Sequence, residues 1–182
     1  MKPTASARDV KKLVQSVRVL IVDDNQYQRN VIRMLLMNIG VKKLYEAGDG
    51  MAAIDTIRTV APDLVILDWE MPFLNGPELV RMVRSPGVFP MPDIPIIMLS
   101  AHCERWRVVE AARLGVNEFL TKPISSAALL ERIVANLANP RPSVKLHNYY
   151  GPEPRKDLPA PVPKPNRPAP PPRPNREEVV VN

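Results

Sequence analysis

The stretch PDLVILDWEMPFLNG, residues 62–76, combines an apolar run with the acidic residues that follow it. A proline opens the stretch, residues 64–67 are all apolar, and Asp68 and Glu70 come after them. An apolar run without polar alternation is typical of a strand that is buried on both faces of a sheet. We therefore expect a buried strand over residues 63–67 with Asp68 at its end.

Four other apolar runs alternate with helical patterns along the chain. These runs cover residues 17–22, 42–47, 94–99 and 117–120. Each run is followed by a segment with the helical spacing of apolar residues; the first segment ends at Gly40 and the last begins after Pro123. Together with the strand at 63–67, five strand–helix units predict an α/β fold, a doubly wound parallel sheet with helices on both faces.

Charge and proline content divide the chain into one globular region and two basic flanks. The net charge is +6, yet residues 18–139 hold 13 basic and 14 acidic side chains. Of the 22 prolines, 13 lie between Pro140 and Pro174, where apolar periodicity is absent. Such a segment cannot offset its own ordering entropy. We expect a basic N-terminal arm at 1–16, one domain at 17–139 and a disordered, Pro-rich, basic tail at 140–182.

Cysteine content and hydropathy indicate the compartment in which the chain works. Cys103 is the single cysteine, so a disulfide framework is excluded. The first residues lack the apolar core of a secretory signal, and no run is long enough to span a membrane. The near-neutral domain also lacks a basic helix interleaved with aromatic residues, which argues against a nucleic-acid module. We expect a cytoplasmic protein without a membrane or nucleic-acid partner.

Polar side chains follow the expected strands at the edge where a parallel sheet binds its ligands. Asp23 and Asp24 end the first strand, Asp68 the third and Ser100 the fourth, while Lys122 follows the fifth. Three uncompensated carboxylates in one place would force at least one of them to take up a proton. A hard divalent cation that binds carboxylates and phosphate oxygens removes this penalty. The pattern therefore predicts a Mg²⁺ site at this edge of the sheet.

In these motifs and their order, the chain resembles the receiver domain of two-component response regulators, in particular the stand-alone receivers of chemotaxis. The resemblance runs through residues 17–139. Each motif alone is weak, but five motifs in order at successive strand ends are specific. The resemblance rests on the Asp23-Asp24 pair, Asp68, Ser100, Phe119 and Lys122. It implies a flavodoxin-like sheet with the strand order 2-1-3-4-5.

The resemblance also implies which acidic residue accepts the phosphoryl group and which ones bind Mg²⁺. Asp68 would be the phosphoacceptor, and a histidine kinase or a histidine phosphotransfer protein would be its donor. Mg²⁺ would bind Asp24, Asp68 and the main-chain carbonyl of Glu70. Asp23 would contact the same ion through a metal-bound water.

The remaining motif residues would act on the phosphoryl group or respond to it. By the same resemblance, Lys122 and Ser100 would contact the phosphoryl oxygens. Ser100 and Phe119 would form the conformational switch. The bond between Lys122 and Pro123 is expected to be cis, which prolyl bonds permit at modest cost.

The implied function is a single-domain response regulator that binds a protein partner when it is phosphorylated. The contact face would be formed by the fourth helix, the fifth strand and the fifth helix of the domain. Such a protein is not an enzyme in the usual sense, because it catalyses only its own phosphoryl transfer and dephosphorylation. An alternative is a phosphorelay intermediate or phosphate sink that passes phosphoryl to or from a histidine. A magnesium-dependent phosphatase is less favoured, because such enzymes need a second acid just after the nucleophile.

Two variable residues near the expected site are assigned to the lifetime of the phosphoryl group. Glu70 and His102 would flank the path of the attacking water, with Glu70 paired to His102 or Lys122. On the helix that follows Ser100, we expect Trp106 and Arg113 to face outward. This expectation holds if Val108, Ala111 and Gly115 form the face of the helix that packs on the sheet.

Overall fold

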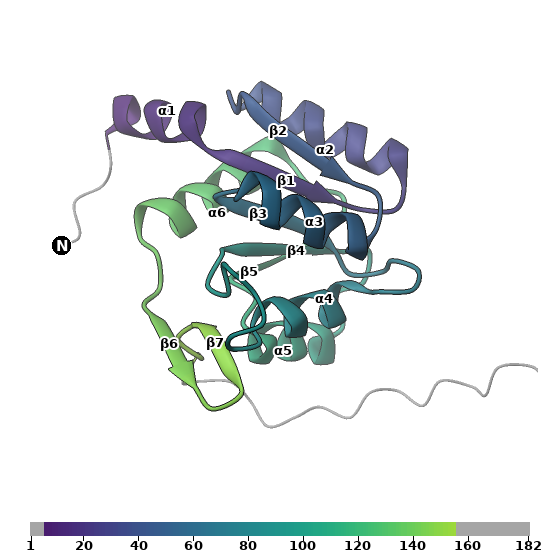
Figure 1. The fold of residues 1–182 in the computed structure, drawn as a ribbon. Coiled ribbons are helices and arrows are strands. Elements are labelled where there is room, and N and C mark those ends of the chain that lie inside the picture. The colour runs from purple at the N-terminus through teal and green to yellow at the C-terminus, as the bar shows by residue number, and fades with distance from the viewer. Residues whose placement is uncertain (1–5, 156–182) are drawn as a thin grey trace, which may run out of the picture.

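The structure is a computed structural model that describes residues 6–155 (Figure 1). The main sheet contains β1 (Arg18–Val22), β2 (Lys43–Ala47), β3 (Leu64–Asp68), β4 (Ile96–Ser100) and β5 (Glu118–Thr121). The helices are α1 (Ala7–Ser16), α2 (Gln26–Asn38), α3 (Gly50–Val60), α4 (Gly76–Val83), α5 (Arg105–Leu114) and α6 (Ser126–Ala138). A hairpin of β6 (Ser143–Leu146) and β7 (Tyr149–Pro152) follows. No helix within residues 6–155 has the length and apolar character needed to cross a membrane.

The five strands of the main sheet are parallel and lie in the order β2-β1-β3-β4-β5, which confirms the expected doubly wound α/β fold. The order reverses between β1 and β3, the position where open α/β sheets bind ligands. Asp68 lies opposite Leu99, and Ser100 lies opposite Thr121. The last residues of β3, β4 and β5 therefore meet at one edge of the sheet.

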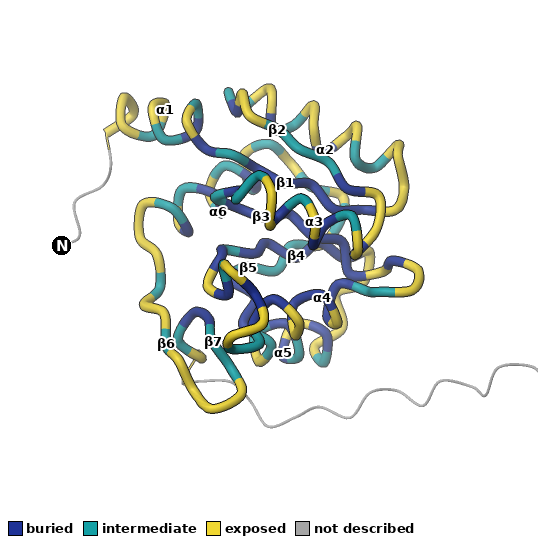
Figure 2. Tube along the Cα trace, in the orientation of Figure 1, coloured by how far each residue is buried: buried dark blue, intermediate teal, exposed yellow. Residues whose placement is uncertain are grey.

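Helices cover both faces of the sheet, and this explains why its strands lack polar alternation. One core lies between the sheet and α3, α4 and α5, and a second lies between the sheet and α1, α2 and α6. Every residue of β3 and β4 is buried, as the dark tube in Figure 2 shows. Residues 64–67 alternate between the two cores, so both sides of the strand require apolar side chains.

The segment predicted as a basic arm contains the helix α1. Ser6 caps it, since the Ser6 hydroxyl accepts a hydrogen bond from the Asp9 main-chain nitrogen at 3.2 Å. Val14 is buried in the second core, and Val10 packs against that core. The basic residues occupy the exposed face, so the charge of the segment concealed an amphipathic pattern. The expectation of a simple arm is corrected for residues 7–16.

The expected disordered tail begins with an ordered antiparallel hairpin, β6 and β7. The hairpin lies beside the carboxyl ends of α4 and α5 (Figure 1), where the main-chain nitrogen of Tyr150 donates to the carbonyl of Arg84 at 2.7 Å. The Tyr149 hydroxyl lies against Gly115, where an added Cβ would collide with it. Local composition does not show such long-range contacts, so the expectation is corrected for residues 143–152. The rest of the predicted tail, residues 156–182, lies outside the described residues.

Arg84 joins the hairpin to the core and is itself fully buried. Its guanidinium donates to the carbonyls of Gly115 (3.0 Å), Pro92 (2.5 Å) and Ile94 (2.9 Å) and to Asn117 Oδ1 (3.3 Å). Burial lowers the pKa of Arg84 to about 10, so it stays charged at neutral pH. A buried cation held by neutral oxygens makes this corner of the fold depend on a single side chain.

The face of α5 that packs on the sheet agrees with the expected one at Ala111 and Gly115 but differs at Val108. Val108 is 41% exposed, whereas Arg107, Val109 and Ala111 are buried. Arg113 is exposed, as expected, but Trp106 is half-buried against the first core. The expectation was wrong at Val108 and Trp106, and a charged residue, Arg107, occupies a buried position on this helix. Its long stem and flat guanidinium allow this when aromatic rings and carboxylates surround it.

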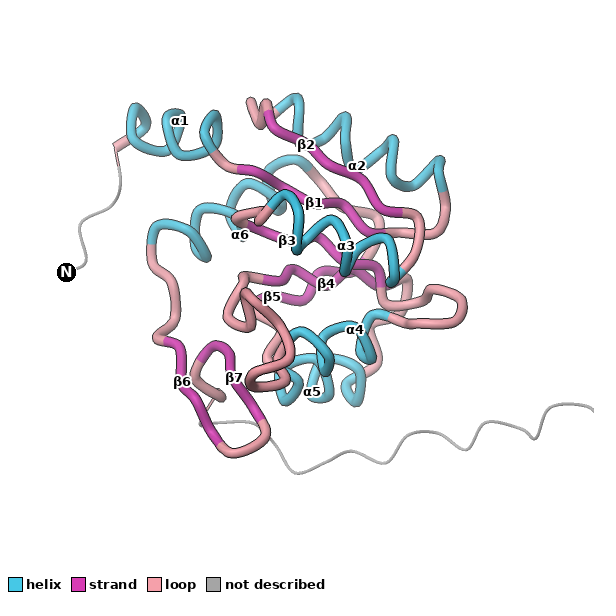
Figure 3. Tube along the Cα trace, viewed as in Figure 1, coloured by secondary structure: helices cyan, strands magenta, loops and turns pink. Residues whose placement is uncertain are grey.

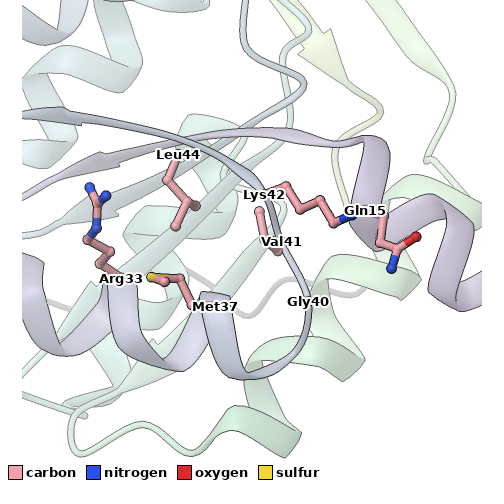
Figure 4. Close-up of a pocket in the computed structure, with 7 residues that line it drawn as sticks. All are labelled: Gln15, Arg33, Met37, Gly40, Val41, Lys42 and Leu44. Carbon is pink, nitrogen blue, oxygen red and sulfur yellow. The ribbon is translucent and has the colours of Figure 1, made fainter.

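A hollow of about 400 Å³ lies between α1, α2 and β2 (Figure 4). It is lined by Gln15, Arg33, Met37, Gly40, Val41, Lys42 and Leu44. Most of these residues come from the end of α2 and the start of β2, at the amino edge of the sheet. The hollow is therefore on the opposite side from Asp68 and is not the site predicted from the sequence.

Candidate functional site

The predicted site residues lie at the strand ends and in the loops of the carboxyl edge of the sheet, magenta and pink in Figure 3. Asp23 follows β1 and is 1% exposed, and Asp68 ends β3 and is 6% exposed. Asp23 Oδ1 accepts a hydrogen bond from the Asn25 main-chain nitrogen at 2.9 Å, and the Asn25 side chain caps α2. The turn after β1 is thereby fixed, with one carboxylate directed inward.

Lys122 joins the two buried carboxylates. Its ammonium donates to Asp68 Oδ1 at 2.6 Å and to Asp23 Oδ2 at 2.9 Å. A third bond goes to the side-chain oxygen of Gln28, on the first turn of α2. The Lys122-Pro123 bond is cis, as expected. A lysine that follows β5 thus reaches acids from β1 and β3, so its long side chain does span the sheet.

The buried position of Asp68 makes it a perturbed acid. Burial raises the pKa of Asp68, the neighbouring Asp23 charge adds to this, and the hydrogen bond and charge of Lys122 oppose it. Burial alone would lower the pKa of Lys122, but its hydrogen bonds and charge interactions with Asp68 and Asp23 outweigh burial and raise it. The lysine therefore stays protonated between the acids, and the site holds a carboxylate with a paired cation.

The loop after β3 holds Asp68 through the main chain. Asp68 Oδ2 accepts a hydrogen bond from the Glu70 nitrogen at 2.8 Å, and the Gly76 nitrogen donates to the Trp69 carbonyl at 3.0 Å. A Cβ at Gly76 would collide with the Asp68 carbonyl oxygen. Gly76 was not among the predicted site residues, although it closes the stretch 62–76. Its role follows from this close approach of two main chains.

The predicted magnesium ligands are only partly brought together. Asp23 and Asp68 share one ammonium, whereas Asp24 is exposed. Within residues 6–155, no group of three or more Asp, Glu, His or Cys side chains is arranged to hold a metal ion. The donor set nevertheless fits Mg²⁺ chemically, because two buried carboxylates, a nearby third and the Glu70 carbonyl are all hard oxygen ligands. The two buried carboxylates already share one cation, that of Lys122.

The predicted switch residues lie on β4 and β5 beside Asp68. Ser100 is buried, and its hydroxyl accepts a hydrogen bond from the His102 main-chain nitrogen at 3.0 Å. Phe119 is half-buried and meets Trp69 edge-on, with 6.1 Å between ring centroids. An aromatic contact thus connects Trp69, the residue after Asp68, to β5.

Charged side chains gather at the mouth of the site. Glu70 Oε1 accepts a hydrogen bond from Arg107 Nη2 at 2.8 Å and lies 3.7 Å from His102 Nε2. The expected proximity of Glu70 and His102 is therefore present, but the nearest charged partner of Glu70 among the described residues is Arg107 and not Lys122. Arg107 and Gln28 were missed by sequence reasoning. Both lie in the first turn of a helix that begins at the carboxyl edge, and that placement is the signal that could have identified them.

Comparison with known proteins agrees with this arrangement. The response regulator receiver domain family matches residues 19–134. Chemotaxis protein CheY-3 of Vibrio cholerae is 32% identical over 121 residues, which cover 66% of this chain and 92% of the relative. Chemotaxis protein CheY of Pseudomonas aeruginosa is 34% identical over 117 residues, which cover 64% of this chain and 93% of the relative.

Two solved structures show the same likeness in three dimensions. The Francisella response regulator 1452 receiver domain has a TM-score of 0.58 and 30% identity, covering 65% of this chain and 93% of that one. Vibrio cholerae chemotaxis protein CheY4 has a TM-score of 0.56 and 29% identity, covering 63% and 93%. Since the family match spans most of the chain and includes every strand end with a site residue, the protein belongs to the response regulator receiver domain family.

Proposed function

We propose that this protein is a cytoplasmic signalling switch whose receiver domain, residues 17–139, takes up a phosphoryl group on Asp68 from a histidine kinase. The observation that carries the proposal is the buried Asp68 carboxylate held 2.6 Å from the Lys122 ammonium, with Asp23 on the same cation. Lys122 thus brings acids from β1 and β3 together at the edge where open α/β sheets bind ligands. The phosphorylated form would bind a protein partner.

The side chains support an in-line phosphoryl transfer. An oxygen of Asp68 forms a bond to phosphorus as the bond from phosphorus to the donor histidine nitrogen breaks, and the electron pair stays on that nitrogen. Lys122 is placed to neutralise the charge that develops on the phosphoryl oxygens. The Ser100 hydroxyl, one strand away, can donate to one of these oxygens. The Glu70 main-chain nitrogen keeps the Asp68 carboxylate oriented.

Mg²⁺ would be held by Asp24, Asp68 and the Glu70 main-chain carbonyl, with Asp23 acting through water. The ion would supply positive charge that reduces repulsion between the anionic donor and the carboxylate. The charges of Asp68 and Asp23 would then be balanced by that ion together with Lys122, and not by Lys122 alone.

The first test is labelling of the purified protein by acetyl phosphate. We expect one phosphoryl group per chain by intact mass, lost on treatment with hydroxylamine because the product is an acyl phosphate, and absent when EDTA removes Mg²⁺. A label that forms equally well in EDTA, or that survives hydroxylamine, contradicts the proposal. Transfer of the label to a histidine phosphotransfer protein would instead favour the relay alternative.

The partner face is proposed to be α5, β5 and α6, which bound a groove of about 430 Å³. Apolar side chains such as Val108, Val109 and Phe119 line the groove, and its basic residues are Arg105, Arg132 and Arg155. Glu118 pairs with Arg132 at 3.3 Å and with Arg155 at 3.5 Å, and the lining of the groove holds this one acid and three arginines. A partner with acidic residues around an apolar contact would complement this groove.

Charge reversal in the groove should weaken partner capture. The protein loaded with beryllofluoride, which stands in for the phosphoryl group, is compared with Asp68→Asn in a pull-down. For proteins captured only in the loaded state, we expect Arg105→Glu to reduce capture at least about tenfold, because like charges across an interface are costly. Arg8→Glu, on α1, is the matched control. Equal capture by the two variants would remove the groove from the proposal.

Glu70 and His102 are predicted to set the lifetime of phospho-Asp68 without being needed to form it. Their side chains lie 3.7 Å apart at the mouth of the site, where a water that attacks the phosphoryl group would have to enter. Glu70→Asn and His102→Ala should each change the dephosphorylation rate several-fold, a barrier change of about 1 kcal/mol. Magnesium-dependent labelling should remain. The rate is measured by loss of the intact-mass label after removal of acetyl phosphate, and an unchanged rate in both variants and in the double variant would refute this role.

A further inference from the structure

We propose that Arg107 is a positioning residue that holds the Glu70 carboxylate across the mouth of the site and thereby slows hydrolysis of phospho-Asp68. The inference rests on the proposed function, since it concerns the stability of the phosphoryl group on Asp68. Arg107 lies outside the sequence motifs, on the first turn of α5.

Arg107 is buried, with only 8% of its surface exposed, which is unusual for an arginine. Its Nη2 donates to Glu70 Oε1 at 2.8 Å, and its Nε lies 3.3 Å from Glu104 Oε2. The Glu70 side chain is 57% exposed, so water surrounds most of it. Of the two partners, Arg107 is therefore the fixed one and Glu70 the one that is held.

Two indole rings fix the guanidinium in place. The Arg107 Cζ atom lies 5.1 Å from the centroid of Trp69 and 4.9 Å from the centroid of Trp106. The two rings meet edge-on at 5.9 Å. A cation stacked on desolvated aromatic faces gains interaction energy and loses freedom to turn. The Glu70 carboxylate is thus hydrogen-bonded to a guanidinium that the two rings keep at a fixed position.

The remaining donors of Arg107 increase its dependence on Glu70. Nε and Nη1 are buried and make no hydrogen bond to any group in residues 6–155. Burying donors that make no hydrogen bond costs desolvation energy, which the hydrogen bond to Glu70 and the ion pair with Glu104 offset. Arg107 is therefore expected to keep Glu70 bound rather than to exchange it for water.

Holding Glu70 has a direct consequence for hydrolysis. The Glu70 nitrogen is bonded to Asp68 Oδ2, so its side chain starts beside the phosphoryl position, and its carboxylate lies between Arg107 and His102. In hydrolysis, a water oxygen bonds to phosphorus, the bond from phosphorus to the Asp68 oxygen breaks, and inorganic phosphate leaves as the carboxylate re-forms. A fixed anion across the water path disfavours the approach of the attacking lone pair. Once released, that carboxylate is free to swing away from the path.

The test is a double-mutant cycle on the dephosphorylation rate. We expect Arg107→Gln to speed loss of the label at least about fivefold, close to 1 kcal/mol. In the Glu70→Gln background, the same change should alter the rate less than about twofold. If Arg107 acted only by supporting the fold, its effect would be the same in both backgrounds. Arg113→Gln, at the far end of α5, is the matched control and should leave the rate unchanged.

A second measurement separates positioning from folding. The Arg107 Nε–H resonance should be sharp in the wild-type protein and should shift or broaden in Glu70→Gln, while melting temperatures confirm that each variant is folded. Additive rate effects combined with an unshifted resonance overturn the inference and leave the proposed function intact. Failure of the wild-type protein to label at all overturns both.

Discussion

Asp68→Ala is expected to lose magnesium-dependent labelling by acetyl phosphate by at least about 1,000-fold, the scale on which removal of a nucleophile acts. Alanine supplies no oxygen to bond to phosphorus. Asp23, the other buried acid, is 1% exposed, against 6% for Asp68, so a phosphodonor reaches its carboxylate less readily. It is therefore a poor substitute for Asp68.

Asp55→Ala is the matched control for this experiment, because Asp55 is an exposed carboxylate on α3. It should label at the wild-type rate, and peptide mapping of the wild-type product should place the label on Asp68. Labelling of Asp68→Ala at a rate close to that of Asp55→Ala would mean that the phosphoacceptor has been assigned to the wrong residue.

Arg84→Met is expected to destabilise the fold by about 3 kcal/mol, since it leaves buried carbonyl oxygens without their donor. The guanidinium donates hydrogen bonds to the carbonyls of Gly115, Pro92 and Ile94 and to the side chain of Asn117. All of these acceptors are neutral, so none of the contacts is an ion pair. Methionine fills part of the volume but donates nothing. For a domain of this size, the melting temperature should fall by roughly 6–12 °C.

Urea unfolding followed by far-ultraviolet circular dichroism gives the free energy directly. Arg8→Met is the control, because Arg8 is exposed on α1 and its loss should change the free energy of unfolding by less than about 0.5 kcal/mol. If the two variants lose equal stability, the carbonyl cage around Arg84 is not what holds the hairpin to α4 and α5.

The residues at the strand ends could be predicted from the sequence because each lies directly after a buried apolar run. The positions of Asp23, Asp68 and Ser100 follow from the parallel sheet alone, and Lys122 needed only the reach of its side chain. Asp24 could not be placed in this way, because a pair of acids in a turn can direct one carboxylate inward and the other to solvent.

The residues that were missed owe their roles to contacts between distant elements. Arg107 lies between Trp69 and Trp106, and a charged residue in a helix gives no local sign that aromatic rings will cover it. The hairpin is ordered through Arg84 and Gly115, far from it in sequence. By contrast, α1 could have been predicted from the sequence, because its apolar residues recur at helical spacing. The basic charge of the segment instead suggested an arm.

Both added segments, α1 and the hairpin, join the domain at the amino edge of the sheet, on the left in Figure 1. The last described residue, Arg155, donates to the Asn117 carbonyl at the start of β5. Reporter proteins, affinity handles or surface attachments joined directly at residue 6 or after Arg155 would therefore start on the side opposite Asp68. A biosensor built on residues 6–155 could be immobilised through either of these positions and still leave Asp68 open to a phosphodonor.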